Sequence, residues 1–178
     1  MISTRLATPD DAAVLAELFY RIDLHYFGPA RASREASAHY AAANLFQPHC
    51  GVRVMLAERN REAVGLATFA LLYPAPDYGG QVFMKDLFTI PEARGCGAGK
   101  ALLQALARHA LVLGCTRLDW TAERGNAEAV AFYHRQGASI VEDKIYYRID
   151  GTALTRFAAG DSCQAIGSRP SADEKEDT

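Results

Sequence analysis

Three alternating glycines between two cations form the segment of this chain best suited to binding a ligand. The segment is Arg94-Gly95-Cys96-Gly97-Ala98-Gly99-Lys100, and it separates a predicted strand from a predicted helix. The first turn of a helix has unpaired backbone N–H groups and the positive end of the helix dipole, and glycines let a pyrophosphate approach the main chain closely. The segment is therefore predicted to bind a phosphate-bearing ligand, and the alternative is a glycine-rich turn without one.

Two common phosphate-binding motifs do not fit this spacing. A Walker loop has a glycine five residues before its Gly-Lys pair and a serine or threonine after it, whereas here Arg94 and Ala101 occupy those positions. The dinucleotide fingerprint GxGxxG needs its third glycine where the chain has Lys100. The spacing therefore disfavours both a nucleoside triphosphate and a dinucleotide.

An α/β arrangement with a mixed sheet is predicted to position this segment. Strand-like and helix-like patterns follow one another, and the helix after the glycines has the most regular apolar stripe in the chain. The expected strands cover 2–7, 52–56, 63–73, 81–90 and 117–121, and the expected helices cover 8–26, 33–44, 98–113 and 126–136. A final hairpin is expected from residues 139–141 and 144–149.

The composition excludes several classes of protein. The 178 residues are 49% apolar and 22% charged with a net charge of -2, which is typical of one soluble globular domain without general attraction to nucleic acid. Four cysteines form no CxxC pair and five histidines form no HExxH motif, so neither a disulfide framework nor a metal site is predicted.

The ends of the chain carry further expectations. Charged residues interrupt the N-terminus and the longest apolar stretch, 65–73, is about half of what a bilayer requires, so neither a signal peptide nor membrane association is expected and the cytoplasm is the predicted location. One domain is predicted over 1–154. Residues 155–178, rich in glycine, serine, proline and acids, are predicted to be a disordered tail.

Two elements together resemble the GCN5-related N-acetyltransferase (GNAT) superfamily. The family's acetyl-CoA motif is the sequence (Arg/Gln)-x-x-Gly-x-(Gly/Ala) between a strand and a helix. It matches Arg94 to Gly99. Its second element, an Asn seven residues before the Tyr of an aromatic-Tyr pair and then Gly-(Ala/Phe), matches Asn126, Phe132-Tyr133 and Gly137-Ala138. The resemblance covers residues 2 to about 154 and implies a mostly antiparallel mixed sheet that is splayed at the acetyl-CoA site and flanked by helices.

Within the superfamily the chain looks similar to the diamine, polyamine and thialysine acetyltransferase branch. The similar stretches are Asp86-Leu87-Phe88-Thr89 and the residues from Tyr147 to Leu154. Lys85 and Tyr26 stand where polyamine-acetylating relatives carry acids. Losing two carboxylates weakens attraction for a polycation, so spermidine is disfavoured as the substrate.

The resemblance implies which residues bind acetyl-CoA and which one donates a proton. The motif strand should splay near Leu87, Phe88 and Thr89, so that their main-chain groups bind pantetheine and polarise the thioester, while Arg94 to Lys100 and Asn126 hold the rest. Tyr133 is implied to protonate the departing thiolate, which a phenol of pKa about 10 can do at neutral pH. The alternatives are a packed aromatic for Tyr133 and a plain helix cap for Asn126.

Several residues are candidates for binding the acceptor amine. An alkylammonium of pKa about 10.4 must lose a proton before attack, which a carboxylate with a bridging water could assist. The candidate bases are Asp86, Asp119 and Glu123, although Asp86 could instead form a structural ion pair with Lys85 or Arg148. The acceptor pocket is expected to include Tyr26, Asp86, Asp119, Trp120 and Thr121.

The predicted function is acetyl-CoA-dependent N-acetylation of a small primary amine, such as a diamine or an amino acid, without a metal. The alternatives are acetylation of a protein lysine or N-terminus, and a non-catalytic CoA-binding sensor. A homodimer is also expected, from the habit of the family and because the apolar hairpin with Ile145, Tyr147 and Ile149 would otherwise present an open sheet edge.

Overall fold

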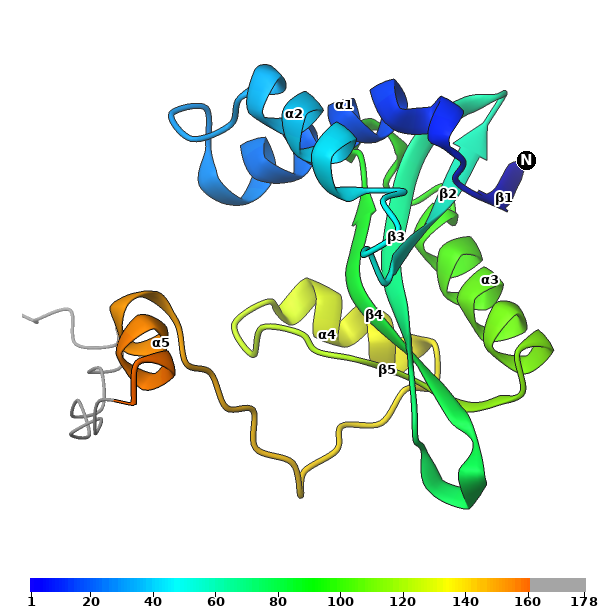
Figure 1. Ribbon diagram of the computed structural model, residues 1–178. Helices are drawn as coiled ribbons and strands as arrows, with labels where there is room; N and C mark the ends of the chain where they lie inside the picture. The colour runs from blue at the N-terminus through cyan, green and yellow to red at the C-terminus, as the bar shows by residue number, and fades with distance from the viewer. Residues whose placement is uncertain (161–178) are drawn as a thin grey trace, which may run out of the picture. The chain divides into compact units, whose positions relative to one another are not determined.

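The computed structural model of the protein describes residues 1–160 (Figure 1). Residues 1–138 and the described residues from 139 to 160 belong to two separate compact units. The first unit contains β1 (Ile2–Leu6), α1 (Ala12–Phe27), α2 (Arg34–Asn44), β2 (Val52–Arg59), β3 (Glu62–Leu72), β4 (Gly80–Thr89), α3 (Ala98–Val112), β5 (Cys115–Trp120) and α4 (Ala127–Arg135). The second contains α5 (Gly151–Ala158).

The sheet is mixed and mostly antiparallel, as expected. Its strand order is β1-β2-β3-β4-β5, and the first three pairings are antiparallel, whereas β4 and β5 run parallel. A parallel pair requires a crossover connection, which α3 provides between β4 and β5. The strands and helices expected up to residue 136 are all present, with ends that differ by a few residues.

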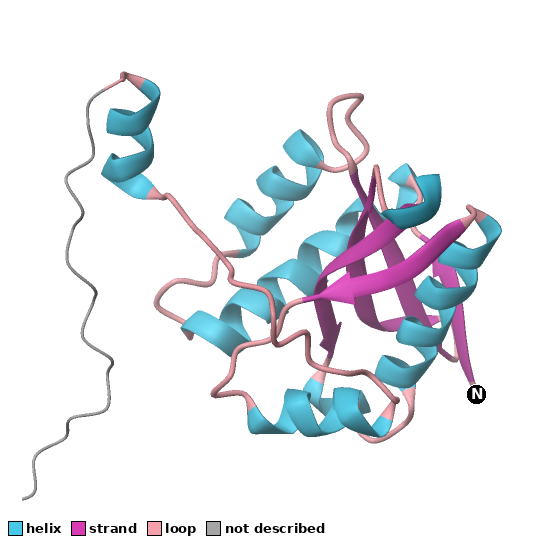
Figure 2. Ribbon diagram, turned by 90° about the horizontal axis from the view of Figure 1, so that it is seen from below, coloured by secondary structure: helices cyan, strands magenta, loops and turns pink. Residues whose placement is uncertain are grey.

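Helices cover both faces of the sheet (Figure 2). One face, here called the α3 face, packs on α3 through a core that includes Leu102 and Met84. The other, the α1 face, packs on α1 and α2 through Leu15 and Leu66. Side chains alternate between the two faces along each strand, so Leu66 and Phe69 of β3 belong to different cores.

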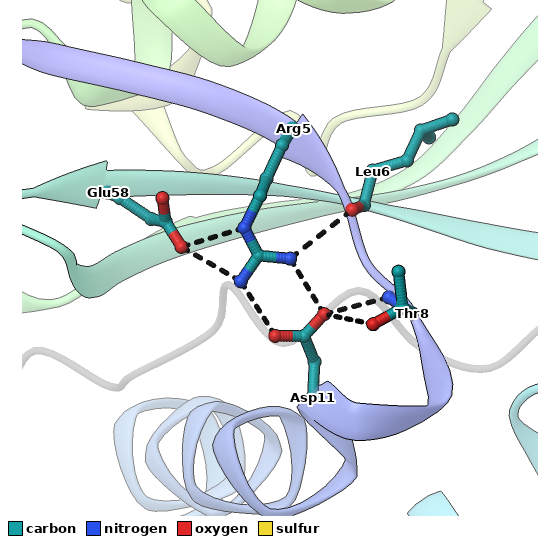
Figure 3. A network of polar contacts seen from close by, with 5 residues as sticks. All are labelled: Arg5, Leu6, Thr8, Asp11 and Glu58. Carbon is teal, nitrogen blue, oxygen red and sulfur yellow. Dashed lines mark hydrogen bonds and ion pairs between the residues drawn. The ribbon is translucent and has the colours of Figure 1, made fainter.

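A polar network ties the start of α1 to the edge of the sheet (Figure 3). Arg5 of β1 donates two hydrogen bonds to the Asp11 carboxylate, each 2.7 Å long, and a third to Glu58 of β2 at 2.9 Å. The Thr8 backbone N–H and hydroxyl also donate to Asp11, at 2.7 and 3.2 Å. The Arg5 guanidinium therefore holds the pKa of the buried Asp11 carboxyl far below its ordinary value.

The hairpin expected over 139–149 is absent from the described structure, because residues 139–150 contain no strand. That expectation is wrong for a single chain. A hairpin alone is only marginally stable in water and needs a third strand or a packing surface. The structure instead forms α5, which crosses the domain boundary expected at residue 154. Residues 161–178 of the expected tail lie outside the described residues, so the division into 1–154 and 155–178 stays a prediction.

Candidate active site

A β-bulge in β4 determines which way the side chains before the glycine segment point. Thr68 of β3 pairs with Asp86, but the next residue, Phe69, pairs with Met84, so Lys85 is an extra residue in β4. Such an insertion moves the following side chains to the opposite face of the sheet. Without it Asp86 would share the α3 face with Met84; with it Asp86 lies on the α1 face.

β4 and β5 separate at this bulge. Their pairing runs from Gly80 with Cys115 to Met84 with Trp120, and β4 then continues to Thr89. Over the described residues, the side of β4 that faced β5 has no strand partner beyond Met84, so its main-chain N–H and C=O groups can bond to an extended ligand. The splay expected near Leu87, Phe88 and Thr89 is confirmed, and it begins two residues earlier.

Thr68 holds the Asp86 carboxylate beside this opening. The Thr68 hydroxyl donates to Asp86 Oδ2 at 2.5 Å and accepts from the Asp86 backbone N–H at 3.1 Å. Thr68 is buried, whereas the Asp86 side chain is 38% exposed, with Oδ1 3.8 Å from Lys85 Nζ. One carboxylate oxygen is therefore anchored and the other remains accessible to an amine. Sequence reasoning missed Thr68, whose signal is a lone hydroxyl within the apolar stretch 63–73.

The glycine segment forms an open turn at the start of α3. Gly97 caps this helix with a φ of +87°, and Gly95 has a φ of +76°, values that favour glycine. A Cβ built on either glycine would meet no atom of the described chain within 4 Å, so the space beside the turn is open. The first N–H groups of α3 have no acceptor within the helix, and Arg94 and Lys100 are exposed at the two ends of the turn. This arrangement suits an anion.

The C-terminal half of α1 contacts the residues that lead into this turn. Arg94 Nη2 lies 3.2 Å from His25 Nε2, and one helical turn earlier Arg21 pairs with Glu92 at 3.4 Å. Because a guanidinium has only donors, His25 Nε2 is the acceptor. The His25 ring also lies 6.1 Å from the ring of Phe88, measured between centroids. Sequence reasoning missed His25, since spacing along a helix does not show which loop the helix end reaches.

Tyr133 of α4 lies next to the end of β5. Its ring contacts that of Trp120, with centroids 5.0 Å apart, at the residue where the pairing of β4 with β5 stops. Burial raises the pKa of Tyr133 above its ordinary value, and the nearby Tyr26 phenol raises it further. Both effects keep the phenol protonated at neutral pH. The structure therefore brings Tyr26, Trp120 and Tyr133 close to the opening.

The remaining predicted site residues lie on β5, in the loop that follows it and at the start of α4. Asn126 caps α4, with its Oδ1 accepting from the Ala129 N–H at 3.1 Å, so the helix-cap role is confirmed and any contact with a ligand stays a prediction. Asp119 forms an ion pair with Arg117 on the same strand at 2.9 Å. Thr121 and Glu123 follow β5 in an exposed loop. Of the three candidate bases, Asp86 is the one beside the splayed strand.

Metal binding and membrane crossing find no support in residues 1–160. In that range, no group of three or more His, Cys, Asp or Glu side chains is placed to hold a metal ion. Within the same range, no helix combines the length and apolar character that crossing a bilayer demands.

Comparison with known families gives a match over most of the first unit. A family model described as "Acetyltransferase (GNAT) family" matches residues 16–138. That range contains the bulged strand, the glycine turn and α4.

Three individual proteins resemble the chain. L-ornithine N5-acetyltransferase NATA1 of Arabidopsis thaliana is 33% identical over 94 residues, which cover 51% of this chain and 41% of that protein. A thialysine N-epsilon-acetyltransferase of Caenorhabditis elegans is 27% identical over 154 residues, 85% of this chain and 93% of the relative. Among solved structures, the integron cassette protein VCH_CASS6 of V. cholerae has a TM-score of 0.84 at 38% identity, covering 88% of this chain and 97% of that one. The chain thus matches less than half of the Arabidopsis protein's length.

Proposed function

Because the chain belongs to the acetyltransferase (GNAT) family, we propose that it transfers an acetyl group from acetyl-CoA to a primary amine of a small molecule. The observation that carries the proposal is the bulge at Lys85, which puts the accessible Asp86 carboxylate beside the opening between β4 and β5. The names of two relatives, an ornithine and a thialysine acetyltransferase, support an amine acceptor. A cytoplasmic location, and the absence of nucleic-acid and membrane partners, stay predictions from composition.

The residues of the glycine turn suit the pyrophosphate of acetyl-CoA. The open space beside Gly95 and Gly97, the free N–H groups of α3 and the exposed cations Arg94 and Lys100 together offer donors and positive charge. The main-chain groups of Leu87, Phe88 and Thr89 that face away from β3 would bind the amides of pantetheine, and one of these N–H groups would stabilise the oxyanion. When bound, acetyl-CoA supplies the acyl group as a reactive thioester.

Asp86 would orient the acceptor and assist its deprotonation. Its accessible oxygen can accept a hydrogen bond from an ammonium or from a bridging water, while Thr68 fixes the other oxygen. Holding amine and thioester in line contributes most, since good alignment alone is worth roughly 7–11 kcal/mol of a barrier. Removing the proton from the ammonium, before the amine attacks, is the step that the carboxylate assists.

Tyr133 would donate a proton to the departing thiolate. The raised pKa of its phenol keeps the proton available throughout the neutral range. A phenol is a weak acid, so a strong hydrogen bond in the transition state would serve as well as complete transfer. The contact with Trp120 fixes the ring beside the opening.

The charges around Asp86 favour an amino acid over a polyamine as acceptor. Lys85 Nζ lies 3.8 Å from Asp86 Oδ1, so a positive and a negative group stand side by side. An amino acid with a side-chain amine carries both an ammonium and a carboxylate, whereas a polyamine carries cations alone that Lys85 repels. Tyr26 offers no compensating acid.

A panel of amines tests the proposal. The chain is incubated with isotopically labelled acetyl-CoA and ornithine, lysine, putrescine, spermidine or lysine-containing peptides, and the products are measured by mass spectrometry. We expect ornithine or lysine to be labelled faster than putrescine or spermidine, and Tyr133→Phe to label each of them much more slowly than the wild type does. Label found on peptides alone would instead indicate a protein acetyltransferase, and binding of acetyl-CoA without transfer to any amine would indicate a sensor.

A further inference from the structure

The α1 face of the sheet is covered by helices at one end only. Both α1 and α2 lie away from the tip of the hairpin that joins β3 to β4 (Figure 1). The apolar core beneath them ends at Val54 on β2 and at Leu66 on β3. Further along the same face, Val52 and Leu72 are 39% and 42% exposed. The helices of residues 1–138 therefore leave this end of the face, here called the shelf, accessible.

Three polar side chains of β4 and β5 meet on the shelf. Leu118 and Trp120 of β5 pack against the core on the α3 face, so alternation turns Arg117 and Asp119 to the α1 face. Gln81 of β4 lies on that face too, because Arg117 Nε donates to its Oε1 at 2.8 Å. Arg117 Nε also forms an ion pair with Asp119 Oδ2 at 2.9 Å. These three side chains are here called the β5 cluster.

The β5 cluster keeps a donor and an acceptor for a ligand. Gln81 Oε1 accepts from both Nε and Nη2 of Arg117, which fixes the plane of the guanidinium. Over residues 1–160, Arg117 Nη1 and Asp119 Oδ1 form no hydrogen bond. The Arg117 and Asp119 side chains are 44% and 37% exposed, so a ligand can reach both. A fixed cation beside an accessible anion complements a carboxylate beside an ammonium, as in the head group of an amino acid.

The separation between the β5 cluster and Asp86 matches the length of a basic amino acid. Asp119 pairs with Phe83, which pairs with Ala70, whereas Asp86 pairs with Thr68 two residues away on β3. Two residues along a strand and one strand across it put the Cα atoms of Asp119 and Asp86 roughly 8 Å apart. The α-carbon and terminal nitrogen of ornithine or lysine are roughly 5–6 Å apart when extended. The two aspartate side chains can span the remainder.

The surface between the β5 cluster and Asp86 is apolar. Ala70 and Phe83 pair with each other on the shelf, and both are half-buried. They offer methylene groups a surface that excludes water. Lys85 Nζ lies 3.8 Å from Asp86 Oδ1, at the end of the shelf where the amine would react. A carboxylate three or four methylenes away therefore needs a different cation, which Arg117 provides.

We propose that the β5 cluster binds the head group of an amino acid whose side-chain amine lies at Asp86. Arg117 Nη1 donates to the α-carboxylate, Asp119 accepts from the α-ammonium, and the methylenes cross Phe83. The side-chain nitrogen forms its bond to the acetyl carbon as the C–S bond of the thioester breaks; one proton of the ammonium passes to solvent and a second ends on the CoA thiol. This inference rests on the proposed function and narrows its acceptor to a basic amino acid, acetylated on the side chain.

Two acceptors that differ by one carboxylate test the site. Putrescine is ornithine without its α-carboxylate, so Arg117→Gln should lower kcat/KM for ornithine by about 10- to 100-fold and leave kcat/KM for putrescine at or above the wild-type value. Asp119→Asn should lower kcat/KM for both, because both carry a second ammonium. Arg108→Gln is the matched control. Arg108 is exposed on α3, on the other face of the sheet, so this variant should leave both acceptors unaffected.

Amine binding in the presence of CoA separates this inference from the proposed function. CoA has no acetyl group, so calorimetry measures the affinities for ornithine and putrescine without turnover. The wild type should bind ornithine more tightly, and Arg117→Gln should remove most of that preference. Ornithine bound through Arg117 but never acetylated would support the site and overturn the proposed function.

Three results would overturn the site. The first is an equal loss of kcat/KM for ornithine and putrescine in Arg117→Gln, which would make Arg117 a structural residue. The second is the same affinity for ornithine in Arg117→Gln as in the wild type. The third is a product acetylated on the α-nitrogen, which tandem mass spectrometry distinguishes from the side-chain product. Acetylation of amines alongside any of these results would leave the proposed function intact.

Discussion

Asp11 and Asp86 are two carboxylates held by hydrogen bonds, and they differ in the number of hydrogen bonds that they accept. Asp11 receives two bonds from Arg5 and two from Thr8, and it is buried (Figure 3). Asp86 receives one hydroxyl bond at Oδ2, its Oδ1 forms a long ion pair with the exposed Lys85 at 3.8 Å, and its side chain is 38% exposed. A carboxylate with filled acceptor sites stabilises the fold, whereas one with a free oxygen at an opening can bind a substrate.

The largest expected effect is a loss of acetyl-CoA affinity at the glycine turn. This turn contains no carboxylate, so the test is independent of Asp11 and Asp86. Gly97→Glu should reduce acetyl-CoA affinity by more than about 100-fold, because the new side chain would fill the pyrophosphate position with a negative charge. Isothermal calorimetry measures the affinity. Gly114→Glu is the matched control, since Gly114 also has a positive φ of +70° and open space at the other end of α3. Equal affinity in the two variants would remove the turn from the site.

Tyr133→Phe removes the hydroxyl and keeps the ring. If the phenol acts on the leaving group, kcat and kcat/KM should fall together by roughly 10- to 1000-fold, while acetyl-CoA affinity barely changes. Steady-state kinetics with the best amine of the panel gives both constants, and Tyr40→Phe on α2 is the control. A loss confined to KM would assign Tyr133 to binding, and full activity would leave it a packed aromatic.

Asp86→Asn should lower kcat/KM for the amine by about 10- to 100-fold, because the amide cannot accept a proton and attracts an ammonium less. Thr68→Val should have a smaller effect, since the carboxylate remains but loses its anchor. Raising the pH should restore part of the activity of Asp86→Asn by supplying neutral amine. The neighbouring Lys85→Gln is the control, and it should improve turnover of polyamines. If Lys85→Gln lowered kcat/KM for the amine as much as Asp86→Asn does, the bulge would have no role in orienting a base.

Asp11→Asn should lower the stability of the fold and leave catalysis unchanged. We expect the free energy of unfolding to fall by about 1–3 kcal/mol. Loss of a fully buried ion pair would cost more, but the Arg5 side chain is 43% exposed. The pKa of Asp11 is lowered in the fold, so its contribution is complete above its ordinary pKa near 4 and is lost as the pH falls toward the lowered value. Urea unfolding should therefore separate wild type from variant at pH 7 and bring them together in acid. A gap that persists in acid would contradict this assignment.

The sequence predicted local features of the site better than features that depend on pairing between distant segments. The glycine turn and the cap at Asn126 are set by neighbouring residues and were placed correctly. The bulge at Lys85 depends on how β4 pairs with β3, and the contact of His25 with Arg94 joins segments 69 residues apart, so neither leaves a local pattern. Residues 139–150 show the opposite error, because their apolar alternation predicts strands that the described structure does not contain.

The central claim is that Asp86 acts on the substrate whereas Asp11 stabilises the fold. The most direct test compares the rate of acetyl transfer per folded molecule between Asp86→Asn and Asp11→Asn. Both substitutions replace a carboxylate with an amide, and only the first concerns a carboxylate with an accessible oxygen at the opening of the splayed sheet. We expect Asp11→Asn to transfer acetyl groups at the wild-type rate once the folded fraction is accounted for, and Asp86→Asn to be at least about tenfold slower. Equal rates of acetyl transfer per folded molecule in the two variants would contradict the role of Asp86 in the reaction.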